Sequence, residues 1–182
     1  MTDEDMILCT TSHGERKAVP RAEWRTRPSV YGISLTEDRG QVLLTRDGLS
    51  HRWELPGGGI DPGERTVSAL VREFAEEVGL TATVGPPVYF ADEFYHYPPH
   101  TGDRTWYSVL LFYLVHTSGA LDSAFTEDRS AGHGSNYGAA WVPVDELDGL
   151  DVLPHHYDAI QRALTWLEAT EGPAAGDDDD DD

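Results

Sequence analysis

Three glutamates, Glu73, Glu76 and Glu77, lie within the nine residues "REFAEEVGL" at positions 72–80. On a helix they share one edge, where each like-charged pair costs roughly 0.2–0.5 kcal/mol. A solvated acidic face is the ordinary explanation of such a cluster. Here, however, no Lys or Arg follows four residues after any of the three, so we expect nothing in the helix to neutralise them at close range. Converging carboxylates are the ligands that Mg²⁺ prefers, so the spacing predicts a divalent-cation site.

The segment before this helix supports the same interpretation. It reads "GGGIDPGE" at 57–64, with three successive glycines followed by a tight turn and Glu64. Glycines allow a backbone to approach a ligand closely, which a merely solvated face does not require. We therefore expect the loop and the helix to form one site.

The stretch from Gly58 to Leu80 resembles a complete Nudix box. Gly58 is followed by five residues and Glu64, then by seven residues and the "REFAEEVGL" segment, so every fixed position of the pattern is matched. Nudix enzymes hydrolyse nucleoside diphosphates linked to another moiety. The resemblance implies Mg²⁺ (or Mn²⁺) as the cofactor and a small-molecule nucleotide as the substrate.

The resemblance also implies roles for individual residues. The principal metal ligands would be Glu73, Glu76 and Glu77, joined by Glu64 and a backbone carbonyl near Gly58. Arg72 would orient a box carboxylate through a charge-assisted hydrogen bond; its alternative is a simple surface ion pair. The metal-activated water would attack a phosphorus atom of the pyrophosphate.

Several residues compete for the role of general base. Related enzymes use either a box glutamate or a carboxylate in the loop before the last strand. Glu73 and Glu76 are the candidates we favour. Loop residues Glu127, Asp128 and His133 are the alternatives, and each can equally be an ordinary solvated side chain.

The substrate is less well defined by the sequence than the reaction. The coenzyme A and NADH signatures of the family are not visible. Aromatic residues and arginines near the box are the candidate substrate contacts, and the aromatic ones are as readily core residues. The predicted substrate-binding residues are Arg52, Trp53, Tyr95, Arg104 and Glu127, with Arg25, Arg27, Arg46 and Tyr97 as further candidates.

The elements that must position these residues follow from hydrophobic periodicity. We expect strands at 29–35, 41–45, the start of 51–64, 81–84, 88–97, 106–116 and 139–144. Helices are expected at 65–79, with an apolar set of Val67, Leu70, Val71, Phe74 and Val78, and at about 154–170, with Tyr157, Ile160, Leu164 and Leu167 buried. The pattern predicts an α/β fold, a Nudix-type α/β/α sandwich with a mixed sheet between helices.

Three segments are expected along the 182 residues. Residues 1–26 form an N-terminal extension or edge strand, 27–171 the Nudix domain, and 172–182 a disordered acidic tail. Many relatives in the family are homodimers, but no exposed apolar stripe in the sequence requires a dimer.

Composition excludes several classes of protein. The net charge of −20, six units of which come from the terminal aspartates, disfavours nucleic-acid polymers and anionic membranes as partners. The single cysteine, Cys9, rules out a disulfide framework. With no apolar run of spanning length and no basic leader, we expect a cytoplasmic protein.

Two other functions share this fold. A catalytically inactive nucleotide-binding sensor is the non-enzyme alternative, although such modules usually lack one or more box glutamates. An isopentenyl diphosphate isomerase would need a catalytic cysteine, and Cys9 lies in the wrong part of the chain.

Overall fold

The computed structural model describes residues 6–11, 14–20, 24–47, 50–96, 105–121 and 136–171, with the backbone alone at 136–137. Its elements, in chain order, are β1 (Met6–Thr11), β2 (Arg16–Pro20), β3 (Trp24–Ile33), β4 (Gln41–Asp47), β5 (Trp53–Glu54), β6 (Gly57–Gly59), α1 (Thr66–Glu77), β7 (Thr81–His96), β8 (Thr105–Ser118), β9 (Asn136–Pro143), the 3-10 helix η4 (Val144–Gly149) and α3 (Pro154–Glu171). None of the described helices is long and apolar enough to cross a membrane.

The strands form a mixed sheet and a smaller antiparallel one. The larger sheet has the order β2-β1-β7-β8-β3-β6, in which β1 runs parallel to β7 and β3 parallel to β8. The smaller sheet has the order β5-β4-β9, and a bridge between Leu35 and Val42 accompanies the turn from β3 to β4. The predicted mixed sheet and α/β class are confirmed. The division into two sheets was not predicted.

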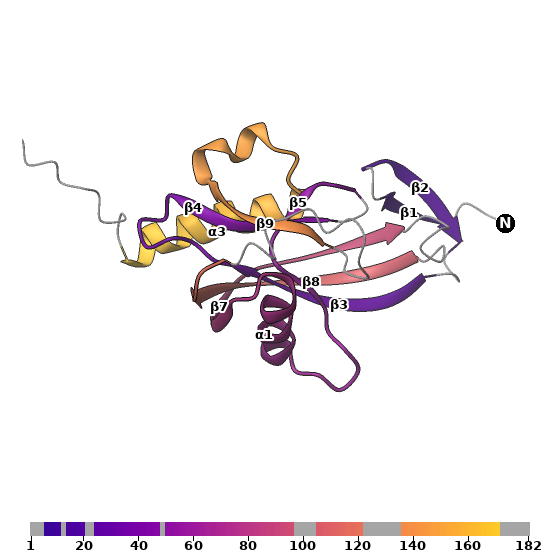
Figure 1. Cartoon of the computed structure of the whole chain (residues 1–182). Helices are drawn as coiled ribbons and strands as arrows, with labels where there is room; N and C mark the ends of the chain where they lie inside the picture. The colour runs from indigo at the N-terminus through magenta and orange to yellow at the C-terminus, as the bar shows by residue number, and fades with distance from the viewer. Residues whose placement is uncertain are drawn as a thin grey trace, which may run out of the picture.

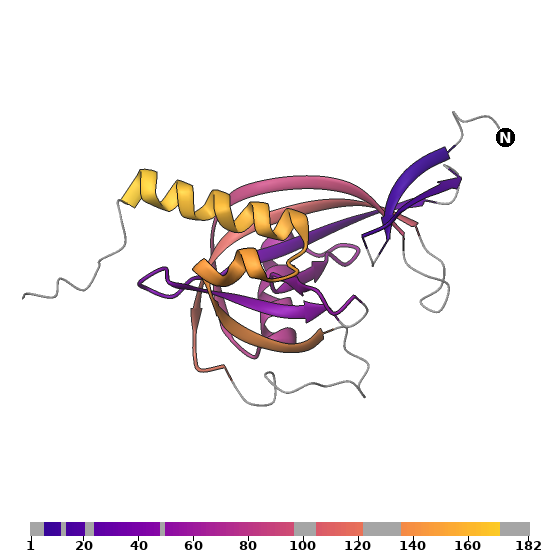
Figure 2. The same ribbon diagram turned by 90° about the horizontal axis from the view of Figure 1, so that it is seen from above.

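The two long helices lie on opposite sides of the strands (Figures 1 and 2). Strand alternation produces this arrangement, because successive side chains point to opposite faces. In β4, Val42 and Leu44 join the core cluster that includes α3, whereas Leu43 joins the cluster that includes α1. Each helix therefore has its own apolar core, as expected of an α/β/α sandwich.

The buried side of α1 differs from the predicted set. Leu70, Phe74 and the following Val78 are buried as expected, but Val67 and Val71 are 51% and 39% exposed. Ala69 is buried in their place. The helix contacts β3, β6 and β7, and the position of those strands, which periodicity does not give, selects the buried side.

In α3, the buried residues are His156, Ala159, Ile160, Ala163 and Leu167. Tyr157 and Leu164, predicted to be buried, are half-buried at the edge of the same core. Small alanines instead occupy the face next to the sheet. The predicted stripe is therefore correct for Ile160 and Leu167 only.

A single strand, β7, replaces the two predicted at 81–84 and 88–97. Its pairing with β8 shifts register between Val84 and Pro87 and again between Pro87 and Tyr89. Proline has no N–H to donate, so an irregularity is where a paired strand tolerates it. The sequence indicated a break, and the structure has a local irregularity instead.

An N-terminal hairpin extends the larger sheet. Residues 1–26, predicted to form an extension or edge strand, contain β1, β2 and the first residues of β3, and β2 lies at the sheet edge. Ile7, Cys9 and Val19 form a small cluster of their own, packed against Trp24 and Phe94. Cys9 is therefore fully buried in the hairpin.

Candidate functional site

Strand β6 fixes the start of the site. Gly57, Gly58 and Gly59 pair antiparallel with Tyr31, Val30 and Ser29 of β3. Gly57 has φ +147°, and a Cβ there would lie 2.2 Å from the Val30 carbonyl oxygen, so only glycine fits. At Gly58 a Cβ would lie 2.8 Å from Glu73 Oε1. The glycines thus allow a carboxylate of α1 to approach the loop backbone.

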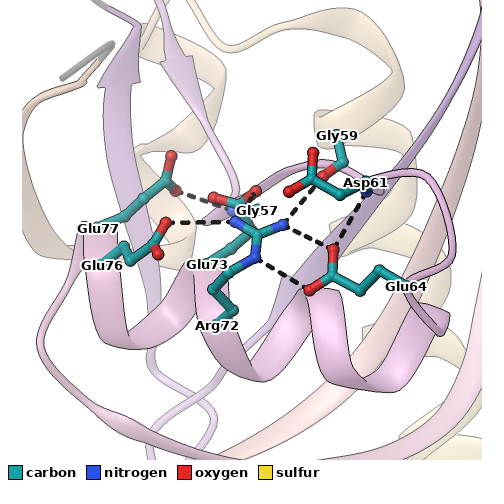
Figure 3. A network of polar contacts seen from close by, with 8 residues as sticks. All are labelled: Gly57, Gly59, Asp61, Glu64, Arg72, Glu73, Glu76 and Glu77. Carbon is teal, nitrogen blue, oxygen red and sulfur yellow. Dashed lines mark hydrogen bonds and ion pairs between the residues drawn. The ribbon is translucent and has the colours of Figure 1, made fainter. Parts of the chain in front are cut away.

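Arg72 lies at the centre of the acidic cluster (Figure 3). Its Nε and Nη2 donate to the two oxygens of Glu64 at 3.0 and 2.9 Å, a bidentate pair. Its Nη1 donates to Glu73 at 2.8 Å and to Glu76 at 3.2 Å. A further bond from Nη2 reaches the Gly59 carbonyl at 3.2 Å. One guanidinium therefore joins three carboxylates and the loop.

The inference from the sequence that no helix cation neutralises the glutamates is wrong. A search for cations four residues after each glutamate misses Arg72, which lies one residue before Glu73 and four before Glu76. The guanidinium contacts Glu64, which precedes it in the chain, and Glu73 and Glu76, which follow it. The cluster is partly neutralised from its own chain.

The remaining carboxylate, Glu77, is held by the loop backbone. The Gly57 N–H donates to Glu77 Oε2 at 2.9 Å. The Asp61 N–H similarly donates to Glu64 Oε2 at 3.1 Å. Backbone donors therefore orient the acids at both ends of the cluster.

The carboxylates differ in exposure and protonation. The side chains of Glu64 and Glu73 are 18% and 13% exposed, whereas Glu76 is 60% exposed. Burial raises the pKa of Glu73, an effect that the Arg72 hydrogen bond opposes. Hydrogen bonds from Arg72 and from the Asp61 N–H lower the pKa of Glu64. Arg72 in turn has a raised pKa because Glu64 accepts its hydrogen bonds.

The donor set fits a hard divalent cation. Four carboxylates and a loop carbonyl supply oxygen ligands of the type that Mg²⁺ and Mn²⁺ accept. In the described ranges, no three His, Cys, Asp or Glu side chains already surround a common point in a ready-made metal site. The acids instead meet through Arg72. Cation binding would therefore exchange contacts to Arg72 for contacts to the ion.

A small polar cavity lies beside this cluster. Its volume is about 60 Å³, and residues from both sheets and the start of α3 contribute to it. It is lined by Arg27, Ser29, Tyr31, Asp47, Ser50, Glu54, Glu93, Tyr95, Ser108, Leu110, Leu153 and His156. Arg27 links the two regions, since burial raises the pKa of both Glu54 and Glu73 and the charge of Arg27 opposes that rise at each.

Two cavity residues carry strongly shifted pKa values. Burial, together with Asp47 and Glu77, raises the pKa of Glu54 well above its usual range. Burial lowers the pKa of His156 to about 3, consistent with its Nδ1 accepting the Leu55 N–H at 2.9 Å.

Sequence reasoning missed Glu54, Glu93 and His156. The only signal for Glu54 was an acid placed between two large apolar residues in "WEL" at 53–55.

The predicted substrate residues have different positions. Tyr95 lines the cavity, as does Arg27. Arg52 is instead held by Asp151 at 2.8 Å and by the Val152 carbonyl at 3.2 Å. Trp53 packs at the edge of the core. The Cζ atom of Arg46 lies over its ring, 5.1 Å from the ring centroid. The predicted residues Arg104 and Glu127, and the further candidates Tyr97, Asp128 and His133, lie outside the described residues.

A larger groove of about 560 Å³ lies further along β3 and β8, at the C-terminal end of α3. None of the box glutamates lines it. Its size alone would suit a ligand, but the cluster of carboxylates lies around Arg72 instead.

Comparisons with known proteins agree with the fold and the box. The NUDIX domain family model matches residues 25–167. An RNA pyrophosphohydrolase of Pseudomonas putida (strain W619) is 54% identical over 54 residues, 30% of this chain and 33% of that protein. The counterpart in Serratia proteamaculans (strain 568) is 49% identical over 55 residues, covering 30% and 31%. The match thus spans about a third of the length of these relatives.

Solved structures are similar over more of the chain. The NUDIX domain of Shewanella oneidensis NrtR, complexed with ADP ribose, has a TM-score of 0.59 and 19% identity, covering 82% of this chain and 93% of that one. A MutT NUDIX hydrolase from Burkholderia pseudomallei has a TM-score of 0.57 and 22% identity, covering 76% and 98%. At these identities the similarity concerns the fold. With the family model matching most of its length, the chain belongs to the NUDIX domain family.

Proposed function

We propose that the chain hydrolyses a pyrophosphate bond in a nucleoside diphosphate linked to another moiety, with Mg²⁺ or Mn²⁺ as cofactor. The observation that carries the proposal is the assembly of Glu64, Glu73, Glu76 and Glu77 around one helix edge and one glycine-rich loop. Membership of the NUDIX family and partial similarity to pyrophosphohydrolases support it.

The four glutamates and the Gly58 carbonyl would hold the cation. Bound there, it would activate a water and neutralise charge on the phosphates. Arg72 would keep Glu64 in position through its bidentate pair. Glu76, the most exposed of the acids that bond Arg72, is placed to pass a proton to solvent, and Glu73 is the alternative base.

The test measures the release of phosphate or nucleotide from a panel of candidate substrates in the presence of Mg²⁺. The panel includes dNTPs, ADP-ribose, nucleotide sugars, diadenosine polyphosphates and a short 5′-triphosphorylated RNA. We expect turnover of at least one member, abolished by Glu76→Gln with the fold intact. The matched control is Glu168→Gln, an exposed glutamate of α3, which should retain full activity.

A nucleotide-binding sensor on the same scaffold is the competing function. Tight binding of a panel member with no turnover, unchanged by Glu76→Gln, would favour it. Cys9 argues against the isomerase, because it is buried with Ile7 and Val19 in the N-terminal hairpin. We propose that the enzyme acts in the cytoplasm, the reducing setting that suits a lone buried cysteine.

A further inference from the structure

Two charged side chains of opposite sign face the small cavity between the sheets. Arg27 comes from β3 and Glu54 from β5, and neither belongs to the box. Both line the 60 Å³ cavity. Because they come from different sheets, the cavity is a meeting point created by the fold.

Among the described residues, packing rather than hydrogen bonding holds the Arg27 guanidinium in place. Its guanidinium lies 5.8 Å from the centre of the Trp106 ring. It also packs against the loop, since a Cβ on Gly59 would lie 2.6 Å from Nη2. Within the part of the chain that the structure describes, no hydrogen bond or salt bridge involves the Arg27 guanidinium. Five N–H donors are therefore positioned beside the cavity.

Glu54 is the matching acceptor. It is half-buried, and across the described segments its carboxyl group accepts no hydrogen bond. The positive charge of Arg27 favours the ionised form of Glu54, yet the two side chains do not form a salt bridge. Two groups that would normally pair with each other instead border a shared space.

The lining indicates which part of a substrate enters. The carboxyl groups of Asp47, Glu54 and Glu93 line the cavity together with the guanidinium of Arg27, so the lining offers oxygen acceptors next to N–H donors. The volume suits the edge of a ring rather than a whole nucleoside. We therefore expect the occupant to be a ring edge that carries both hydrogen-bond acceptors and donors.

We propose that Arg27 and Glu54 form a specificity site that reads the edge of a guanine base; this rests on the proposed function. Guanine presents acceptors, O6 and N7, that suit arginine, next to N1–H and N2–H donors that suit a carboxylate. Adenine keeps the N7 acceptor but reverses the rest of this pattern. It would set an amine against the donors of Arg27 and a ring nitrogen against Glu54.

The test uses calorimetry with GMP, IMP and AMP in the presence of Mg²⁺, which needs no turnover. We expect GMP to bind about tenfold or more tightly than AMP, with IMP in between because it lacks the N2 amine. Equal affinities, no GMP binding, or equally tight binding of ribose 5-phosphate would overturn the proposal.

Variants identify the residues. Arg27→Gln and Glu54→Gln should each weaken GMP binding about tenfold while leaving AMP binding nearly unchanged. The matched controls, Arg162→Gln and Glu168→Gln, change exposed residues of α3 and should bind GMP as the wild type does. Unchanged GMP affinity in both cavity variants overturns the assignment. If a variant fails to fold, the wild-type series still decides.

The outcome separates the two proposals. Guanine preference without hydrolysis of any panel nucleotide would refute the proposed function and keep the specificity site. Hydrolysis of a panel nucleotide with no preference for guanine would refute the specificity site and keep the proposed function.

Discussion

The Arg72 guanidinium forms ion pairs with three carboxylates of the candidate site. It contacts Glu64, Glu73 and Glu76 at 2.8–3.2 Å. A cation bound to the same acids would take over part of this neutralisation. The contribution of Arg72 to stability should then depend on metal.

Arg72→Ala should lower the free energy of unfolding by about 2 kcal/mol in EDTA, because hydrogen bonds to charged groups are lost and the acids repel. At saturating Mg²⁺ the gap to wild type should narrow, since the ion supplies the missing charge. Urea unfolding under both conditions measures this, with Arg162→Ala as the control. A gap that is equal or larger in Mg²⁺ would contradict the account.

His156 gives a prediction about pH. Its folded pKa of about 3 lies below its ordinary value of 6.5, so it stabilises the fold above pH 6.5 and this contribution is lost as the pH falls. Between about pH 7 and about pH 5 the loss is about 2 kcal/mol. An asparagine placed at position 156 would retain an acceptor for the Leu55 N–H, but its side chain does not titrate.

His156→Asn should therefore be destabilised at neutral pH, through lost contacts with Tyr31 and Phe112, and less so in acid. Unfolding free energies of both proteins across this pH range provide the measurement. A difference that stays constant with pH would show that His156 does not remain neutral.

At the scale of elements, helix α1 packs tightly against strand β3. A Cβ on Gly32 would lie 2.5 Å from Cε2 of the buried Phe74 and 2.7 Å from Cγ2 of Val115. Gly32→Ala should therefore destabilise the fold by about 1–3 kcal/mol, as overpacking does. At Gly149, by contrast, a Cβ would meet nothing within 4 Å.

Gly149→Ala is the matched control and should change stability by less than about 1 kcal/mol in either direction. Chemical denaturation of both variants tests the pair. Similar effects at the two positions would mean that helix α1 can shift away from β3.

The elements that were predictable are those with strong local patterns. The box helix, the apolar strand β8 and the final helix follow from periodicity. Strand β6 was not predictable, because its glycines pair through backbone contacts to β3 that leave no side-chain pattern. The exposure of Val67 and Val71 depends on which strands α1 meets, which is long-range information.

The same contrast between local patterns and long-range contacts applies to the residues of the candidate site. The four glutamates lie close in sequence, so their spacing predicted the cluster that the structure shows at Glu64, Glu73, Glu76 and Glu77. Arg27 and Glu54 are brought together by pairing across two sheets. No local pattern joins them.

At the scale of the whole molecule, the net charge of −20 disfavours polyanions. RNA without a 5′-triphosphate should therefore not compete with a nucleotide substrate at physiological salt. Hydrolysis assays with increasing amounts of such RNA provide the check. Inhibition that weakens steeply with added salt would reveal a basic binding surface and contradict this prediction.

Diffraction from crystals grown with Mn²⁺, at a wavelength that gives anomalous signal, tests the central claim most directly. We expect a peak about 2.1 Å from carboxylate oxygens of Glu73, Glu76 and Glu77, with the contact from Arg72 to Glu76 broken and the peak weakened in Glu76→Gln. Active enzyme whose Mn²⁺ lies elsewhere, with these acids still bound to Arg72, would contradict it.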